Sequence, residues 1–140
     1  ETFVPQVCIS HGAALAMVKK AVERGLESGW RVNAAVVDSS GSLVAFLRTS
    51  GSFLHSINIA IDKAYTAASF NMPTADLFNL IKDSPALRDG LLQRPRLIAF
   101  AGGFPIRIEG KLLGGIGVSG ATEEGDCVCA HAGLSTIDPV

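Results

Sequence analysis

Residues 97–120 read LIAFAGGFPIRIEGKLLGGIGVSG, and this stretch decides the fold. It contains three apolar runs, Leu97–Phe100, Pro105–Ile108 and Leu112–Val118, which are interrupted by glycines. Short apolar runs bounded by glycines are typical of strands, and the Glu109-Gly110 pair is typical of a hairpin turn. We therefore predict three strands here, of which the last two form a hairpin.

A further hairpin is predicted upstream of this stretch. The apolar runs Val32–Val37 and Leu43–Leu47 flank Asp38-Ser-Ser-Gly41, a sequence that favours a tight turn. The chain thus has five predicted strands. They are expected to be mostly antiparallel, because short turns join neighbouring strands in that orientation.

The remaining segments show helical spacing of their apolar residues, for example at Leu15, Val18, Val22 and Leu26. The predicted helices cover residues 10–28, 54–70 and 75–82, with one or two turns around 86–92 and a last helix from Thr122 to 132 or 134. Ser10 and Thr74 are the expected N-caps of the first and third helices. This order predicts a single α+β domain over residues 1–140. Its five-stranded, mostly antiparallel sheet would be flanked by helices in an α/β/α sandwich.

Composition narrows the function classes. The chain is 48% hydrophobic and 18% charged, with a net charge of −1 and no basic stripe, so no nucleic-acid partner is expected. It has no run of about 18 uncharged apolar residues, so no membrane partner is expected either. An apolar chain with few charges favours a homo-oligomer, because large exposed apolar patches are disfavoured.

The N-terminal sequence and the cysteines indicate the cellular location to expect. The chain begins at Glu1 without an initiator Met and without a signal-like segment, which predicts a cytoplasmic protein and leaves open a leader that has been removed. Cys8, Cys127 and Cys129 form an odd set with neither zinc-site nor disulfide-framework spacing. They are interpreted as reduced, small apolar residues.

Four motifs are familiar together: Asp62-Lys-Ala-Tyr-Thr-Ala-Ala-Ser-Phe70, Pro73-Thr74, Gly102-Gly-Phe-Pro-Ile106 and Gly114-Gly-Ile-Gly-Val-Ser-Gly120. Across nearly its whole length the chain resembles the GlcG/HbpS-like family, which is related to the C-terminal domain of some cobalamin adenosyltransferases. The resemblance implies a five-stranded antiparallel sheet and dimers that assemble further, often into octamers. It also implies either haem binding or a role in a catabolic operon, since function varies within the family.

A glycine-lined pocket is the main prediction for ligand binding. Gly102, Gly103 and Gly120 would let a ligand approach the backbone, with Ser119 adding a hydroxyl. Backbone N–H groups at the start of the last helix could hold a carboxylate. The alternative is that these glycines serve only tight packing. Phe70 and His55 complete the ligand-binding candidates.

Candidate catalytic residues are Lys63, Tyr65, Arg48 and Asp38. A lysine facing a pocket could bind a carboxylate or act as a base, whereas the simpler alternative is a surface lysine. Arg48 could clamp a carboxylate. Asp38, at the other end of the same hairpin, either lines the pocket or only shapes the turn.

Haem is the cofactor considered, bound noncovalently because no C-x-x-C-H attachment motif is present. Its iron would need an axial ligand, for which His55 is placed ahead of His11 and His131. Cys127 and His131 share a helix face, but two ligands do not make a metal site, and no metal is predicted.

Three functions remain open at this point. The first is a small-ligand-binding protein that holds haem or another tetrapyrrole. The second is a cofactor-independent isomerase, tautomerase or hydrolase acting on a small carboxylated metabolite. The third is a structural or regulatory oligomer, for which replacing Lys63 by alanine would cost little stability.

Overall fold

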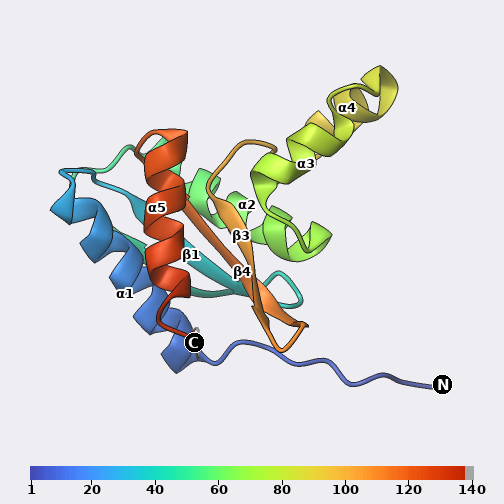
Figure 1. The fold of residues 1–140 in the computed structure, drawn as a ribbon, viewed down its shortest axis with the longest axis horizontal. Coiled ribbons are helices and arrows are strands. Elements are labelled where there is room, and N and C mark those ends of the chain that lie inside the picture. Colours follow the sequence, from blue (N-terminus) through green and yellow to red (C-terminus); the bar gives the residue numbers. More distant parts are fainter. Residues whose placement is uncertain (138–140) are drawn as a thin grey trace.

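The sheet has four antiparallel strands in the order β2-β1-β4-β3 in the computed structural model, which describes residues 1–137 (Figure 1). The strands are β1 (Asn33–Asp38), β2 (Leu43–Arg48), β3 (Gly103–Ile108) and β4 (Lys111–Ser119). The helices are α1 (His11–Glu27), α2 (His55–Phe70), α3 (Thr74–Ile81), α4 (Pro85–Leu92) and α5 (Glu123–Leu134). Both predicted hairpins form, and the α+β class and the flanking helices are as predicted.

Two layers of helix cover the sheet. Helices α1 and α5 lie side by side on one face and α2 lies on the other (Figure 1). The side chains of β1 alternate accordingly: Ala34 and Val36 join the core with α1 and α5, while Ala35 and Val37 pack toward α2. On α1, Val18 and Val22 are buried, whereas Leu15 and Leu26 are exposed.

The prediction of a fifth strand at Leu97–Phe100 is wrong. This segment has no strand partner among residues 1–137, because its backbone groups bind side chains of the helices instead. The N–H of Ile98 donates to Oγ1 of Thr66, and the carbonyl of Phe100 accepts from Oγ1 of Thr74. The position beside β4 is already occupied by β3. The apolar run therefore lies across α2 and α3 as an extended connection.

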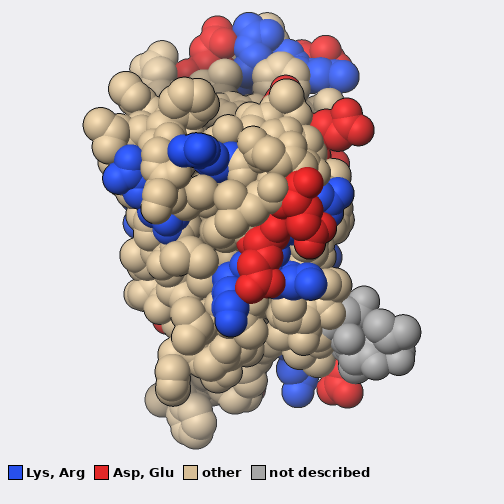
Figure 2. All heavy atoms as spheres, turned by 90° about the vertical axis from the view of Figure 1, so that its left-hand side faces the viewer, with Lys and Arg blue, Asp and Glu red and all other residues tan. Residues whose placement is uncertain are grey.

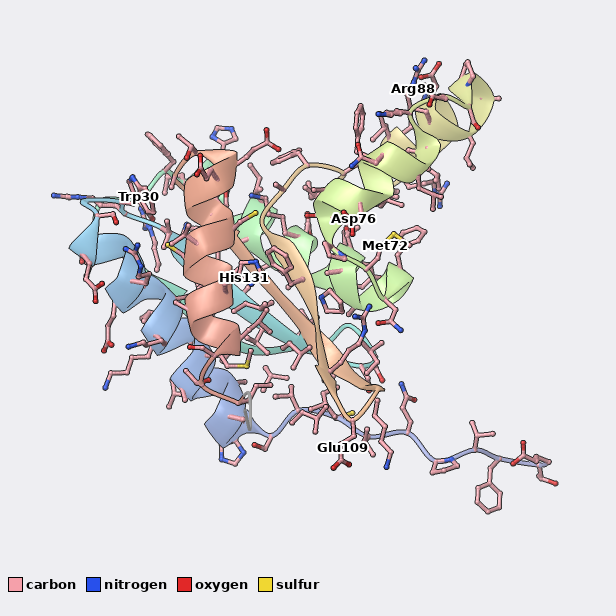
Figure 3. All side chains as sticks on the ribbon, in the orientation of Figure 1. Trp30, Met72, Asp76, Arg88, Glu109 and His131 are labelled. Atoms are coloured by element: carbon pink, nitrogen blue, oxygen red, sulfur yellow. The ribbon has the colours of Figure 1, made fainter. Side chains whose placement is uncertain are left out.

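Thr74 is therefore not the N-cap of the third helix. Its hydroxyl makes a 2.6 Å hydrogen bond to the carbonyl of Phe100, and the capping position belongs to Pro73. The two short helices α3 and α4 project from the body of the molecule, with Arg88 on the outer one (Figures 1 and 3). None of the described helices is long and apolar enough to cross a membrane.

Glycines bring α2 unusually close to β4. A Cβ at Gly115 or Gly117 would collide with the backbone carbonyl oxygens of Ala64 or Ala60, respectively. Both glycines point to the α2 face, because they are two residues apart on the strand. Bare backbone on this face lets the helix pack directly on the strand, and that contact fixes where Lys63 enters the interior.

The described surface carries no dominant charge on the face turned to the viewer in Figure 2. Basic and acidic side chains are interspersed there among a largely uncharged surface. This distribution agrees with the net charge of −1.

Candidate functional site

Lys63 is a buried residue, not the surface lysine of the simpler interpretation. Its side chain is 1% exposed and its Nζ lies 3.1 Å from Oδ2 of Asp126 on α5. The same Nζ donates to the carbonyl of Val118 at 2.8 Å. Oδ1 of Asp126 in turn accepts from the N–H of Ala121. The lysine thus joins α2 to the end of β4 and to the first turn of α5.

Backbone and aromatic atoms close around this ion pair. A Cβ at Gly102 would lie 2.6 Å from Nζ of Lys63, and Gly102 itself has a φ of +124°. The ring of Phe100 lies 5.0 Å from the same Nζ, within the range of a cation–π interaction. Gly102 is therefore needed so that the chain can pass over the lysine, and Phe100 covers it.

Burial sets the electrostatics of the pair. Desolvation lowers the pKa of Lys63, and the attraction and hydrogen bond of Asp126 act against it. Desolvation likewise raises the pKa of Asp126, opposed by Lys63 and by the N–H of Ala121. Each charge is therefore costly alone, and each is tolerated because the other is in contact with it.

Phe100 also lines an apolar pocket of about 640 Å³, whose wall residues do not include Lys63. Its walls come from α3, the end of α4, the extended connection and the start of α5. They comprise Ala75, Phe78, Asn79, Leu92, Leu97, Ile98, Ala99, Phe100, Ala101 and Glu123. This volume is typical of pockets for small molecules and cofactors, which are mainly apolar with a few polar groups.

The structure corrects the prediction that glycines line the pocket. No glycine is among these wall residues. A Cβ at Gly103 would lie 2.6 Å from the carbonyl oxygen of Lys63, and one at Gly120 would lie 2.7 Å from that of Arg31. Ser119, at the end of β4, is 6% exposed. Gly102 and Gly103 lie against Lys63, and the space beside all three glycines is filled by other atoms of the protein.

The N-terminal end of α5 is likewise occupied by side chains of the protein itself. Oε1 of Glu123 accepts from the N–H of Ala101, and Asp126 accepts from Ala121. Thr122 caps the helix by accepting from Gly125. A carboxylate does sit at this helix start, as the acidic first turn suggests, but it belongs to the protein.

The four catalytic candidates do not come together. Arg48 pairs with Asn33 at one end of β1, and Asp38 lies at the other end, roughly 17 Å away for five residues of strand. Arg48 binds Ser52 through Nε and Nη2. Oδ1 of Asp38 accepts from two N–H groups of the β1–β2 turn, so Asp38 shapes that turn.

Tyr65 and Phe70 also lie away from Lys63. The ring of Tyr65 contacts Gly41 in the β1–β2 turn and lies under the guanidinium of Arg96. Phe70 ends α2 and is 36% exposed. Both residues line a second, smaller pocket rather than the apolar one. One shared pocket with Lys63, Arg48, Asp38 and Tyr65 is therefore wrong.

The histidines lie apart from one another. His55 begins α2 and His11 begins α1. His131 of α5 (Figure 3) packs against Phe104 of β3 in a tilted arrangement, with ring centroids 4.5 Å apart. None of the three lines the apolar pocket. Within residues 1–137, no three or more His, Cys, Asp or Glu side chains are grouped so as to hold a metal ion.

Sequence reasoning missed the partner of Lys63 and most of the apolar pocket. Asp126 looked like one of several acidic residues in the first turn of a helix, and nothing in its spacing links it to a lysine 63 positions earlier. Phe78 lies on the projecting α3, whose position depends on tertiary packing. The one available signal was Lys63 itself, a charged residue within the Ala-rich helix α2.

The cysteines give a direct test of burial around this site. Cys129 is fully buried, and burial raises its pKa to about 11, whereas Cys8 is exposed. At pH 8 only about one Cys129 in a thousand would be a thiolate. With a chromogenic disulfide reagent, we expect Cys8 to react at once and Cys129 at least about a hundredfold more slowly. Cys8→Ser should remove the fastest phase and leave the partly buried Cys127 to react next, and rapid labelling of Cys129 in the folded protein would contradict the structure.

Known proteins of similar sequence and structure identify the family of this chain. The chain is 32% identical over 127 residues to an uncharacterized 15.0 kDa protein in the dhaT-dhaS intergenic region of Citrobacter freundii, covering 90% of this chain and 89% of that protein. It matches the crystal structure of an HbpS double mutant from Streptomyces reticuli with a TM-score of 0.88 and 33% identity, over 98% of this chain and 92% of that one.

A second solved structure is described as a complex with haem. The crystal structure of a PduOC–haem complex matches with a TM-score of 0.84 and 28% identity, over 94% of this chain and 96% of that one. The model of the family described as haem degrading protein HbpS-like matches residues 9–135. The chain therefore belongs to the HbpS-like family, as the motifs around Lys63 and Gly117 predicted.

Proposed function

We propose that this protein binds haem or another tetrapyrrole noncovalently in the apolar pocket beside Phe100. The observation that carries the proposal is the pocket itself, with about 640 Å³ of space and two phenylalanines, Phe78 and Phe100, among its wall residues. Aromatic and aliphatic walls suit a large planar ring, because such a ring gains most from apolar burial and stacking. The complex of PduOC with haem supports this ligand class.

The pocket walls suit the macrocycle of haem, but they offer no usual axial ligand for its iron. Its polar wall residues are Asn79 and Glu123, and neither is a usual axial ligand of haem. An axial histidine would have to come from outside these walls, and His55 is the candidate we retain. A bound haem would supply its iron chemistry, while this chain would supply apolar contact and exclusion of water.

The test is a haemin titration of the purified protein, followed by absorbance. We expect a Soret shift that saturates at one haem per chain. Ala75→Trp fills the pocket wall on α3 and should weaken binding by at least about tenfold, because it removes the apolar volume. The matched control Ala86→Trp adds the same side chain at an exposed position of α4 and should leave binding unchanged.

Two results would contradict the proposal. A titration that is featureless or never saturates would reject tetrapyrrole binding. Equal binding by Ala75→Trp and the wild type would reject this pocket as the site. His55→Ala is expected to change the absorbance spectrum while keeping the stoichiometry, since its role would be iron ligation and not apolar contact.

A second candidate is a cofactor-independent enzyme acting on a small carboxylated metabolite. The buried Lys63–Asp126 pair beside the pocket wall favours it, because shifted pKa values are common at catalytic sites. Phe100 lies over Nζ of Lys63, so a substrate in the pocket would meet that ring before it met the amine. Binding without catalysis is therefore the better-supported function.

We also propose a homo-oligomer, between a dimer and an octamer. Leu15 and Leu26 of α1 and the adjacent pair Phe53 and Leu54 are each more than half exposed. Exposed apolar side chains in such numbers favour contacts between copies of the chain.

A further inference from the structure

A second pocket, of about 190 Å³, lies between the C-terminal half of α2 and the loop that follows α4. It shares only Leu97 with the apolar pocket and has a different character. Two arginines, Arg94 and Arg96, and two hydroxyl-bearing residues, Tyr65 and Ser69, contribute to its walls. Its volume equals that of about six water molecules, enough for a small oxyanion.

Arg96 is held in place by three contacts. Its Nε donates to Oδ1 of Asp62 at 3.1 Å, and its guanidinium lies 3.7 Å from the ring centroid of Tyr65. Its carbonyl accepts from Oγ1 of Thr66 at 2.9 Å. Together these contacts hold Arg96 at a φ of 66°, a backbone conformation that is uncommon for a residue other than glycine. Side-chain entropy is thus already lost before any ligand binds.

Arg96 has N–H groups that donate no hydrogen bond to the described residues. Within residues 1–137, neither Nη atom of Arg96 has a hydrogen-bond partner, although Nε has one. In the same part of the chain Arg94 makes no ion pair and no side-chain hydrogen bond, and the hydroxyls of Tyr65 and Ser69 are likewise unpaired. With Asp62 counted, the two arginines leave a local charge of +1 at the pocket.

We infer that this second pocket binds a small oxyanion, a phosphate or carboxylate group, through Arg94 and the free Nη edge of Arg96. Guanidinium groups present parallel N–H donors that match two oxygens of such an anion. The Tyr65 and Ser69 hydroxyls can donate to the remaining oxygens. The site is independent of the proposed tetrapyrrole pocket, because it shares none of the aromatic residues of that pocket.

Isothermal titration calorimetry at low ionic strength tests the inference, with inorganic phosphate in one arm and malonate in the other. The two arms separate a site for phosphate from a site for carboxylates. We expect one anion per chain in at least one arm. Arg94→Gln should weaken that binding by about tenfold, because it removes a charged donor pair. The control Arg24→Gln removes the same charge from α1 and should leave the affinity unchanged.

A third variant acts in the opposite direction. Asp62→Asn keeps an oxygen for Nε of Arg96 but removes the competing negative charge, so the anion should bind several-fold more tightly. No binding in either arm, or equal losses in Arg94→Gln and Arg24→Gln, would overturn the inference. Unchanged or weaker binding in Asp62→Asn would overturn the role of Arg96. Haemin binding by Arg94→Gln should match the wild type, so the two proposals fail separately.

Discussion

Replacing Lys63 by methionine is expected to lower the free energy of unfolding by about 3–5 kcal/mol. Methionine fills a similar volume, but it leaves the Asp126 carboxylate buried without its positive partner. It also removes the donor to the carbonyl of Val118. Urea denaturation at pH 7, monitored by circular dichroism, measures the change.

Two further variants show whether the ion pair is the cause. Lys82→Met changes an exposed lysine at the end of α3 and should alter stability by less than about 0.5 kcal/mol. The double variant Lys63→Met/Asp126→Leu removes both charges and should recover much of the loss, since an apolar replacement of both partners is often neutral. A cost below about 1 kcal/mol for Lys63→Met would support the surface-lysine interpretation instead.

Gly117→Ala is expected to destabilise the fold by at least about 3 kcal/mol, the upper range for overpacking. The new Cβ would meet the backbone carbonyl oxygen of Ala60 and lie 2.5 Å from the N–H nitrogen of Ala64. Neither atom is the end of a flexible side chain, so α2 as a whole would have to move off β4. Thermal unfolding measures the effect.

The matched control uses a glycine with space around it. Gly90 lies within α4, and a Cβ there would meet nothing within 4 Å. Gly90→Ala should therefore stabilise the protein by about 0.5–1 kcal/mol, through the higher helix propensity of alanine. If Gly117→Ala were as stable as the wild type, direct packing of α2 on β4 could not be correct.

The glycines of β4 and the turn that precedes this strand show how far the sequence predicts the fold. The glycines of β4 mark close backbone approach, and packing against α2 is one of the two interpretations that they allow. The hairpin turn is also readable, since Glu109 and Gly110 both have positive φ, as a tight two-residue turn between twisted strands requires. Local patterns of this kind predict both hairpins and every helix to within a residue or two.

Features that depend on distant residues were not predictable. Leu97–Phe100 has the composition of a strand, but its hydrogen bonds go to threonines of α2 and α3, so tertiary contacts override its propensity. The same limit applies to the site. Asp126 becomes the partner of Lys63 only because α2 and α5 approach the end of β4 from opposite faces of the sheet.

The position of haem in a crystal of this protein soaked with haemin tests the central claim most directly. We expect density for the macrocycle in the apolar pocket, between Phe78 and Phe100, with the Lys63–Asp126 pair intact behind the latter ring. Haem bound at another surface, with this pocket empty, would contradict the assignment of the pocket. An absence of bound haem at saturating haemin would contradict tetrapyrrole binding as the function.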